Sequence, residues 1–93
     1  IKEFAEAAVT SFKEFQENYT SFLMARDEVN FRKAGHKIKP VAQMLGLGLI
    51  IEEYELGKTF IWEEKSDSYL KASCKKMDAI CNQVLDELKD IAQ

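Results

Sequence analysis

Histidine, cysteine and proline are scarce in this chain, and their scarcity narrows the kinds of site that it can hold. The 93 residues include one histidine, two cysteines and one proline. One histidine and two cysteines at this spacing match no metal-ligand pattern, so we expect no metal site. Cys74 and Cys81 lie two helical turns apart, about 10 Å, which is too far for a disulfide with each other. We therefore expect two buried, reduced thiols.

Long apolar runs and a broad basic surface are missing too. The longest apolar run, residues 45–51, is far shorter than the roughly 20 residues of a membrane span, and no signal peptide is visible. The net charge of −3 argues against a general nucleic-acid binder. We therefore expect no direct contact with a membrane or with nucleic acid. The expected location is cytoplasmic, either free or as the cytoplasmic part of a membrane-anchored parent.

Helix-forming residues make up most of what remains, and their periodicity predicts four helices. Apolar side chains recur at steps of three and four within residues 1–25, 28–45, 47–62 and 68–91. The third helix either stops at Gly57 or continues through Trp62 with the glycine inside it. Asp27 is expected to cap the second helix, and Ser66 or Asp67 the fourth.

The four helices together predict an all-α fold, an antiparallel up-and-down four-helix bundle. The chain is long enough for one core, so we expect a single domain over residues 1–93. Because it begins at Ile1 without a methionine, we expect it to be a piece of a larger protein. The core stripes expected for the first and last helices are Phe4, Ala8, Phe12, Phe15, Tyr19 and Phe22, and Met77, Ile80, Cys81, Val84, Leu88 and Ile91.

The single histidine, His36, occupies the outer face of the second predicted helix. At about 100° per residue it points away from an apolar sector formed by Phe31, Ala34, Ile38, Val41, Ala42 and Leu45. No acidic residue occurs between Glu28 and Glu52, while four cations lie in that interval: Arg32, Lys33, Lys37 and Lys39. We therefore expect a solvated imidazole within a basic patch, an arrangement suited to chemistry with an anion.

Three further residues shape the surroundings of this histidine. Pro40 lies four positions after His36, removes the backbone hydrogen bond to its carbonyl and is expected to bend the helix. The bend either opens the surface beside the imidazole or is a tolerated kink. Gln43, further along the same face, either contacts a partner or is solvated. Gly46 permits a sharp turn out of the helix, because glycine adopts left-handed dihedrals without steric cost.

An exposed imidazole with a lysine nearby can take part in phosphoryl transfer. A ring nitrogen of neutral imidazole is a good nucleophile and can attack a phosphoryl group to give a labile phosphoramidate. Lys39 lies within one helical turn of His36 and can steady phosphoryl oxygens. Such a transfer depends mainly on alignment and charge neutralisation, so a partner can supply the remaining groups.

The segment HKIKPVAQMLG, residues 36–46, resembles the signature of histidine phosphotransfer (HPt) domains, which serve multistep two-component phosphorelays. That signature has a histidine, a lysine at +3, a small residue, usually glycine, at +4, and a glycine at +10. An acidic cap commonly stands nine residues before the histidine. The matching residues here are His36, Lys39, Gly46 and the cap Asp27. The four-helix organisation extends the resemblance from about a dozen residues to most of the chain.

Two positions depart from the family's pattern. Pro40 replaces the usual glycine at +4, whose lack of a side chain keeps the approach to the imidazole clear. Gly35 stands where alanine commonly precedes the histidine, a change that costs about 1 kcal/mol of helix propensity and should leave the chemistry intact.

The resemblance implies that His36 accepts a phosphoryl group from an aspartate of a response-regulator receiver domain and passes it to another receiver aspartate. Lys39 would steady the phosphate and Gly46 would end the helix. The receivers would bring the aspartate and Mg²⁺, so this domain is expected to bind no cofactor of its own. A monomeric phosphocarrier within a hybrid sensor kinase is implied, without autonomous kinase activity. The residues facing the receivers would be Arg32, Lys33, Lys37, Pro40 and Gln43.

Three other interpretations remain open. A dimerisation and phosphoacceptor domain of a sensor kinase also places a histidine on a bundle helix, but its motif has an acidic residue directly after the histidine and proline at +5, unlike Lys37 and Pro40. A noncatalytic helical module could use His36 and its basic surroundings only to dock an acidic protein. An independent hydrolase or metal enzyme lacks a second acid, base or ligand set near His36.

Overall fold

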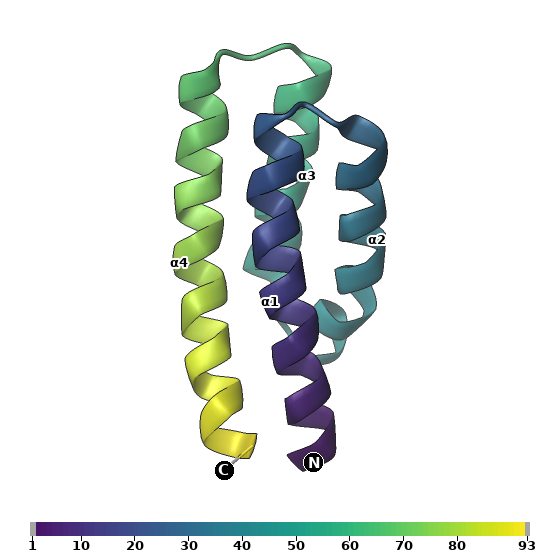
Figure 1. Ribbon diagram of the computed structural model, residues 1–93, viewed down its shortest axis with the longest axis vertical. Coiled ribbons are helices and arrows are strands. Elements are labelled where there is room, and N and C mark those ends of the chain that lie inside the picture. Colours follow the sequence, from purple (N-terminus) through teal and green to yellow (C-terminus); the bar gives the residue numbers. More distant parts are fainter. Residues whose placement is uncertain (1, 93) are drawn as a thin grey trace.

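The structure, a computed structural model, describes residues 2–92, with the backbone alone at residue 92. Within this range the chain forms helices and turns, and no strand. Successive helices run in opposite directions (Figure 1), which confirms the predicted all-α four-helix bundle. The third helix passes through Gly57 rather than stopping there. The helices are α1 (Lys2–Met24), α2 (Glu28–Met44), α3 (Gly48–Trp62) and α4 (Asp67–Ala92).

The bundle consists of a long pair and a short pair of helices. The helices α1 and α4 have 23 and 26 residues, whereas α2 and α3 have 17 and 15. Each helix packs against two neighbours, α1 against α2 and α4, and α3 against the same two helices. The ends of α1 and α4 extend together past the turn between α2 and α3 (Figure 1). One end of the bundle is therefore a two-helix layer.

Two of the predicted core residues are not buried. Phe4 and Ile91 were expected in the core stripes, but they are 39 and 52% exposed. Ile91 lies near the end of α4, which extends with α1 past the turn between α2 and α3 (Figure 1). In the first turns of α1 the buried position is Ala5, which is 1% exposed, and Phe4 is rotated about 100° away from it around the helix axis. Phe22 and Ile80 are partly buried against the core, and the other residues of the two stripes are buried.

Aromatic rings at the centre of the core join three helices. The ring of Tyr19 on α1 lies 5.0 Å from that of Phe31 on α2, and Phe31 stacks on Tyr54 of α3 at 5.1 Å. Gly57 makes this packing possible, because a Cβ atom there would lie 2.6 Å from the Tyr19 hydroxyl and 2.9 Å from the Phe31 ring. The glycine inside α3 is thus required by a close approach of rings rather than merely tolerated.

Both cysteines are buried and unpaired, as the sequence predicts. Burial is the main cause that raises the pKa of the Cys74 thiol, and it raises the pKa of Cys81 to about 12. A protonated, enclosed thiol is a weak nucleophile. These residues therefore act as small apolar side chains.

All three turns begin with the same helix-ending hydrogen bond. The amides of Asp27, Leu47 and Lys65 donate to carbonyls five residues earlier, at 2.9, 2.8 and 3.0 Å. The residue before each amide has a left-handed backbone, with φ of 55° at Arg26, 69° at Gly46 and 54° at Glu64. This is a Schellman motif, in which glycine is preferred because it has no Cβ. Gly46 therefore ends α2 as expected.

The left-handed position is a glycine in only one of these turns, and this difference leads to a stability prediction. Gly46→Ala should lower the free energy of unfolding by about 1 kcal/mol, because alanine is strained in a left-handed conformation. Glu64→Gly should raise it by up to about 1 kcal/mol for the converse reason, less the entropy that glycine loses on folding. Urea unfolding of both variants measures the two effects. A destabilised Glu64→Gly variant would contradict the explanation.

Candidate functional site

His36 lies near the middle of α2 with its side chain exposed, opposite the buried residues Phe31, Ile38 and Ala42. This is the orientation that the apolar periodicity predicts. The residues around it on the outer face are also exposed, except Lys39, which is partly buried: they are Arg32, Lys33, Lys37, Pro40 and Gln43. All of the predicted site residues except Gly46 therefore belong to one helical face, and Gly46 lies in the turn that follows it.

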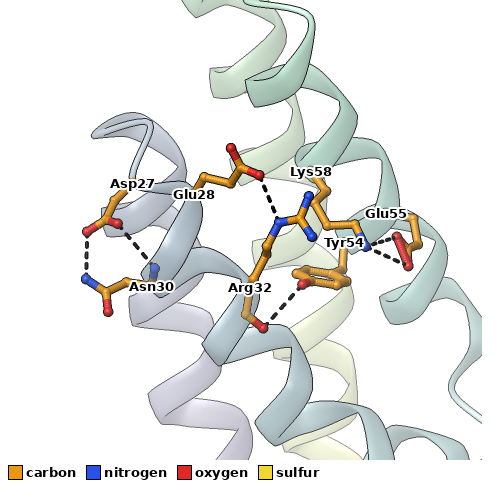
Figure 2. Close-up of polar contacts among 7 residues, drawn as sticks. All are labelled: Asp27, Glu28, Asn30, Arg32, Tyr54, Glu55 and Lys58. Atoms are coloured by element: carbon orange, nitrogen blue, oxygen red, sulfur yellow. Dashed lines mark hydrogen bonds and ion pairs between the residues drawn. The ribbon is translucent and has the colours of Figure 1, made fainter.

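The start of α2 is held by the predicted cap. The Asp27 side chain accepts hydrogen bonds from the backbone amide of Asn30 at 3.2 Å and from its side-chain amide at 2.7 Å (Figure 2). These two bonds are the main causes that lower the pKa of Asp27. A carboxylate at this position also complements the positive end of the helix. The cap therefore fixes where α2 begins, nine residues before His36.

Two of the four cations near His36 are engaged in lateral ion pairs. Arg32 Nε lies 3.0 Å from a carboxylate oxygen of Glu28 (Figure 2), and Lys37 Nζ lies 2.7 Å from one of Glu14 on α1. Lys33 and Lys39 form no ion pair with any residue in the range 2–92. These two lysines are therefore the cations of the patch that have no ion-pair partner among the described residues.

An ion pair on α3 lies beside the basic face of α2. Glu55 of α3 pairs with Lys58 at 2.8 Å, and the hydrogen bond from Lys58 is the main cause that lowers the pKa of Glu55. Lys39 and Arg32 lower it further by their charge, which places both near this carboxylate. Figure 2 shows the Arg32 side chain extending from α2 towards Tyr54 and Lys58. The sequence interpretation missed Glu55 and Lys58. The periodicity of α3 shows on which face of the helix they lie, but it does not show which neighbouring helix that face approaches.

Gly35 brings α2 close to α3 directly beside the histidine. It is buried, and a Cβ atom at this position would overlap the ring of Tyr54. The Tyr54 hydroxyl donates to the Arg32 carbonyl at 3.4 Å (Figure 2). Burial is the main cause that raises the pKa of Tyr54. Gly35 is thus a packing residue that sets the distance between α2 and α3, a role that its helix propensity does not reveal.

Pro40 does not end the helix, which continues to Met44. Because proline has no backbone N–H, the carbonyl of His36 lacks the donor that normally lies four residues on. Pro40 itself is exposed. A backbone acceptor at His36 is therefore left without its helical partner, on the face that carries the imidazole.

The part of the chain that the structure describes contains no group of three or more histidine, cysteine or acidic residues that could hold a metal ion. None of its four helices combines the length and apolar composition needed to cross a bilayer.

No protein-family model matches this chain, and no curated protein or solved structure is significantly similar to it.

Proposed function

We propose that this chain is a histidine phosphotransfer module, which accepts a phosphoryl group from a receiver-domain aspartate on His36 and passes it to another receiver aspartate. The observation that carries the proposal is the exposed His36 on a rigid helix with Lys39 one turn away. A capped helix within a packed bundle holds the backbone at His36 in place and directs its side chain away from the core, where a receiver can approach it.

The proposed transfer needs little chemistry from this chain. A ring nitrogen of His36 attacks the phosphorus of an aspartyl phosphate, so that a P–N bond forms while the P–O bond breaks and the carboxylate leaves with the electron pair. Mg²⁺ on the receiver would neutralise charge on the phosphoryl oxygens. Lys39 and Lys33 add positive charge from this side.

The ion-paired cations suit the approach of an acidic partner. Arg32 and Lys37 are paired with Glu28 and Glu14 on an exposed surface, where such pairs contribute about 0–1 kcal/mol. They can therefore exchange these partners for acidic groups of a receiver at little cost. Pro40 and Gln43 complete the exposed surface that would face the receiver.

The proposal is tested by incubating the chain with a panel of phosphorylated receiver domains in Mg²⁺. Label that is lost in acid and kept in base, and that maps to His36, is the expected result. Absence of label from every receiver, with binding still detectable, would instead favour the noncatalytic docking module. A stable dimer labelled by a kinase domain would favour the sensor-kinase phosphoacceptor domain.

Lys39→Ala should slow phosphoryl transfer by at least about tenfold, because it removes a positive charge one turn from the phosphoryl group. Its effect on the free energy of unfolding should be small, since Lys39 forms no ion pair within residues 2–92. Rapid-quench measurement of the labelling rate checks the prediction. Lys71→Ala, an exposed change on α4, is the control. Equal rates for the two variants would remove the proposed role of Lys39.

A further inference from the structure

A continuous groove runs between α3 and α4, and none of the residues that line it belongs to α2. Its middle part has a volume of about 530 Å³. A second part of about 200 Å³ shares Glu53, Leu56 and Lys76 with the middle, and a third of about 240 Å³ shares Leu49. Because α3 has 15 residues, the groove extends for roughly 20 Å.

Large apolar side chains stand exposed along this groove. Leu49, Leu56 and Tyr69 are 64, 46 and 49% exposed. The two leucines are seven residues apart, so they project from the same side of α3, two turns from each other. Tyr69 lies across the groove on α4, with its ring 5.5 Å from that of Phe60. Apolar side chains gathered in one exposed groove are typical of a protein–protein contact.

The groove is acidic, in contrast to the basic face of α2. Four glutamates line it, and its one lining cation is Lys76. Two of these glutamates, Glu53 and Glu55, are paired with lysines. The other two, Glu52 and Glu87, are exposed and form no ion pair with any residue that the structure describes. A partner that fits this charge carries Lys or Arg beside its apolar residues.

A rigid carboxylate lies at the centre of the groove. Glu53 is buried, and its Oε2 accepts a hydrogen bond from Ser73 Oγ at 2.6 Å, while Ser73 Oγ lies 2.7 Å from the Tyr19 hydroxyl. The other oxygen, Oε1, lies 3.3 Å from the ammonium of Lys76, whose side chain is largely exposed. The Lys76 ammonium therefore forms an ion pair with the Glu53 carboxylate at the edge of the groove. Both oxygens of Glu53 are thus already occupied, and the carboxylates left for basic side chains of a partner are the exposed Glu52 and Glu87.

We propose that this groove binds an amphipathic helix of a partner protein, which places apolar side chains on Leu49, Leu56 and Tyr69 and basic side chains beside Glu52 and Glu87. Both walls are helices, so an extended peptide finds no strand edge to join. A helix has its own backbone bonds satisfied and can present residues at i, i+3 or i+4, and i+7 along the groove. Neither His36 nor any other residue of α2 lines the groove, so the inference does not depend on the proposed phosphotransfer.

The test uses three synthetic peptides of about 18 residues, five helical turns. The first is an amphipathic helix with leucines on one face and lysines on its flanks, the second replaces the lysines with glutamates, and the third scrambles the order of the first. Each is titrated into the ¹⁵N-labelled chain. We expect saturable binding of the first peptide alone, with amide shifts along the groove, and weaker binding at high salt.

Three double variants make the test specific. Leu49→Ser with Leu56→Ser should weaken binding by at least about tenfold. Val29→Ser with Met44→Ser, at two α2 residues that are 65 and 71% exposed, should change it by less than about twofold. Glu52→Lys with Glu87→Lys should reverse the preference, so that the glutamate peptide binds more tightly than the lysine peptide.

Several results would overturn the inference. These are no saturable binding, equal binding of the scrambled or the acidic peptide, shifts centred on α2, and unchanged affinity after the double leucine substitution. Amide shifts of groove residues that change with the concentration of the chain, without any peptide, would assign the groove to a second copy of this chain. That result would overturn the inference too. Circular dichroism of each variant verifies that the bundle is still folded.

Discussion

His36→Gln should abolish phosphate uptake and leave the free energy of unfolding within about 0.5 kcal/mol of the parent value. The amide of glutamine has hydrogen-bonding capacity but no nucleophilic ring nitrogen. The side chain is exposed on the outer face of α2, so its replacement removes no core contact. Label transfer from a phosphorylated receiver and urea unfolding measure the two effects separately.

Lys71→Ala, an exposed change on a different helix, should take up label at the parental rate and serves as the control. The His36→Gln variant should also still bind the receiver, because the surrounding cations are unchanged. Uptake of label by the folded His36→Gln variant at the parental level would place the phosphate elsewhere and end the phosphotransfer proposal.

Gly35→Ala should lower the free energy of unfolding by about 2 kcal/mol, more than Gly46→Ala. A Cβ atom at Gly35 would overlap the Tyr54 ring, and that ring is held by its stacking on Phe31 at 5.1 Å. Overpacking of this kind typically costs about 1–3 kcal/mol, and the better helix propensity of alanine offsets up to about 1 kcal/mol of it. Urea denaturation gives the difference directly.

Gly48→Ala is the matched control for this prediction, because a Cβ atom there would meet no atom within 4 Å. It should leave stability unchanged or slightly higher. Combining Gly35→Ala with Tyr54→Leu should recover part of the loss, since the smaller side chain leaves room for the new methyl group. The double-mutant cycle should therefore be non-additive. Equal stabilities of the Gly35→Ala and Gly48→Ala variants would show that the Tyr54 ring moves aside without a loss of stability, and would contradict the prediction.

Local features of the chain were readable before the structure because they depend on neighbours in sequence. The Asp27 cap needs only the amide of Asn30 three residues on. The outward direction of His36 follows from the phase of one helix, since its apolar face must be buried. The left-handed turn at Gly46 likewise depends on one residue's freedom to adopt positive φ.

The ends of the core and the charge at the site were less predictable. Phe4 fits the three- and four-residue steps of the predicted stripe of α1, yet it is exposed, because Ala5 occupies the buried position there. Lys37 belongs to a segment without acidic residues, yet it pairs with Glu14 from another helix. Periodicity gives the direction of a side chain but not what lies opposite it.

The sequence by itself therefore determined four amphipathic helices, their bundle, the cap of α2 and an outward histidine with a lysine one turn away. Only the tertiary structure decided which cations near His36 remain unpaired within residues 2–92, why Gly35 and Gly57 are glycines, and where an acidic groove opens between α3 and α4. The first group follows from helix geometry over a few residues. The second depends on the relative lengths and close approach of helices that are far apart in sequence, and no local pattern encodes these.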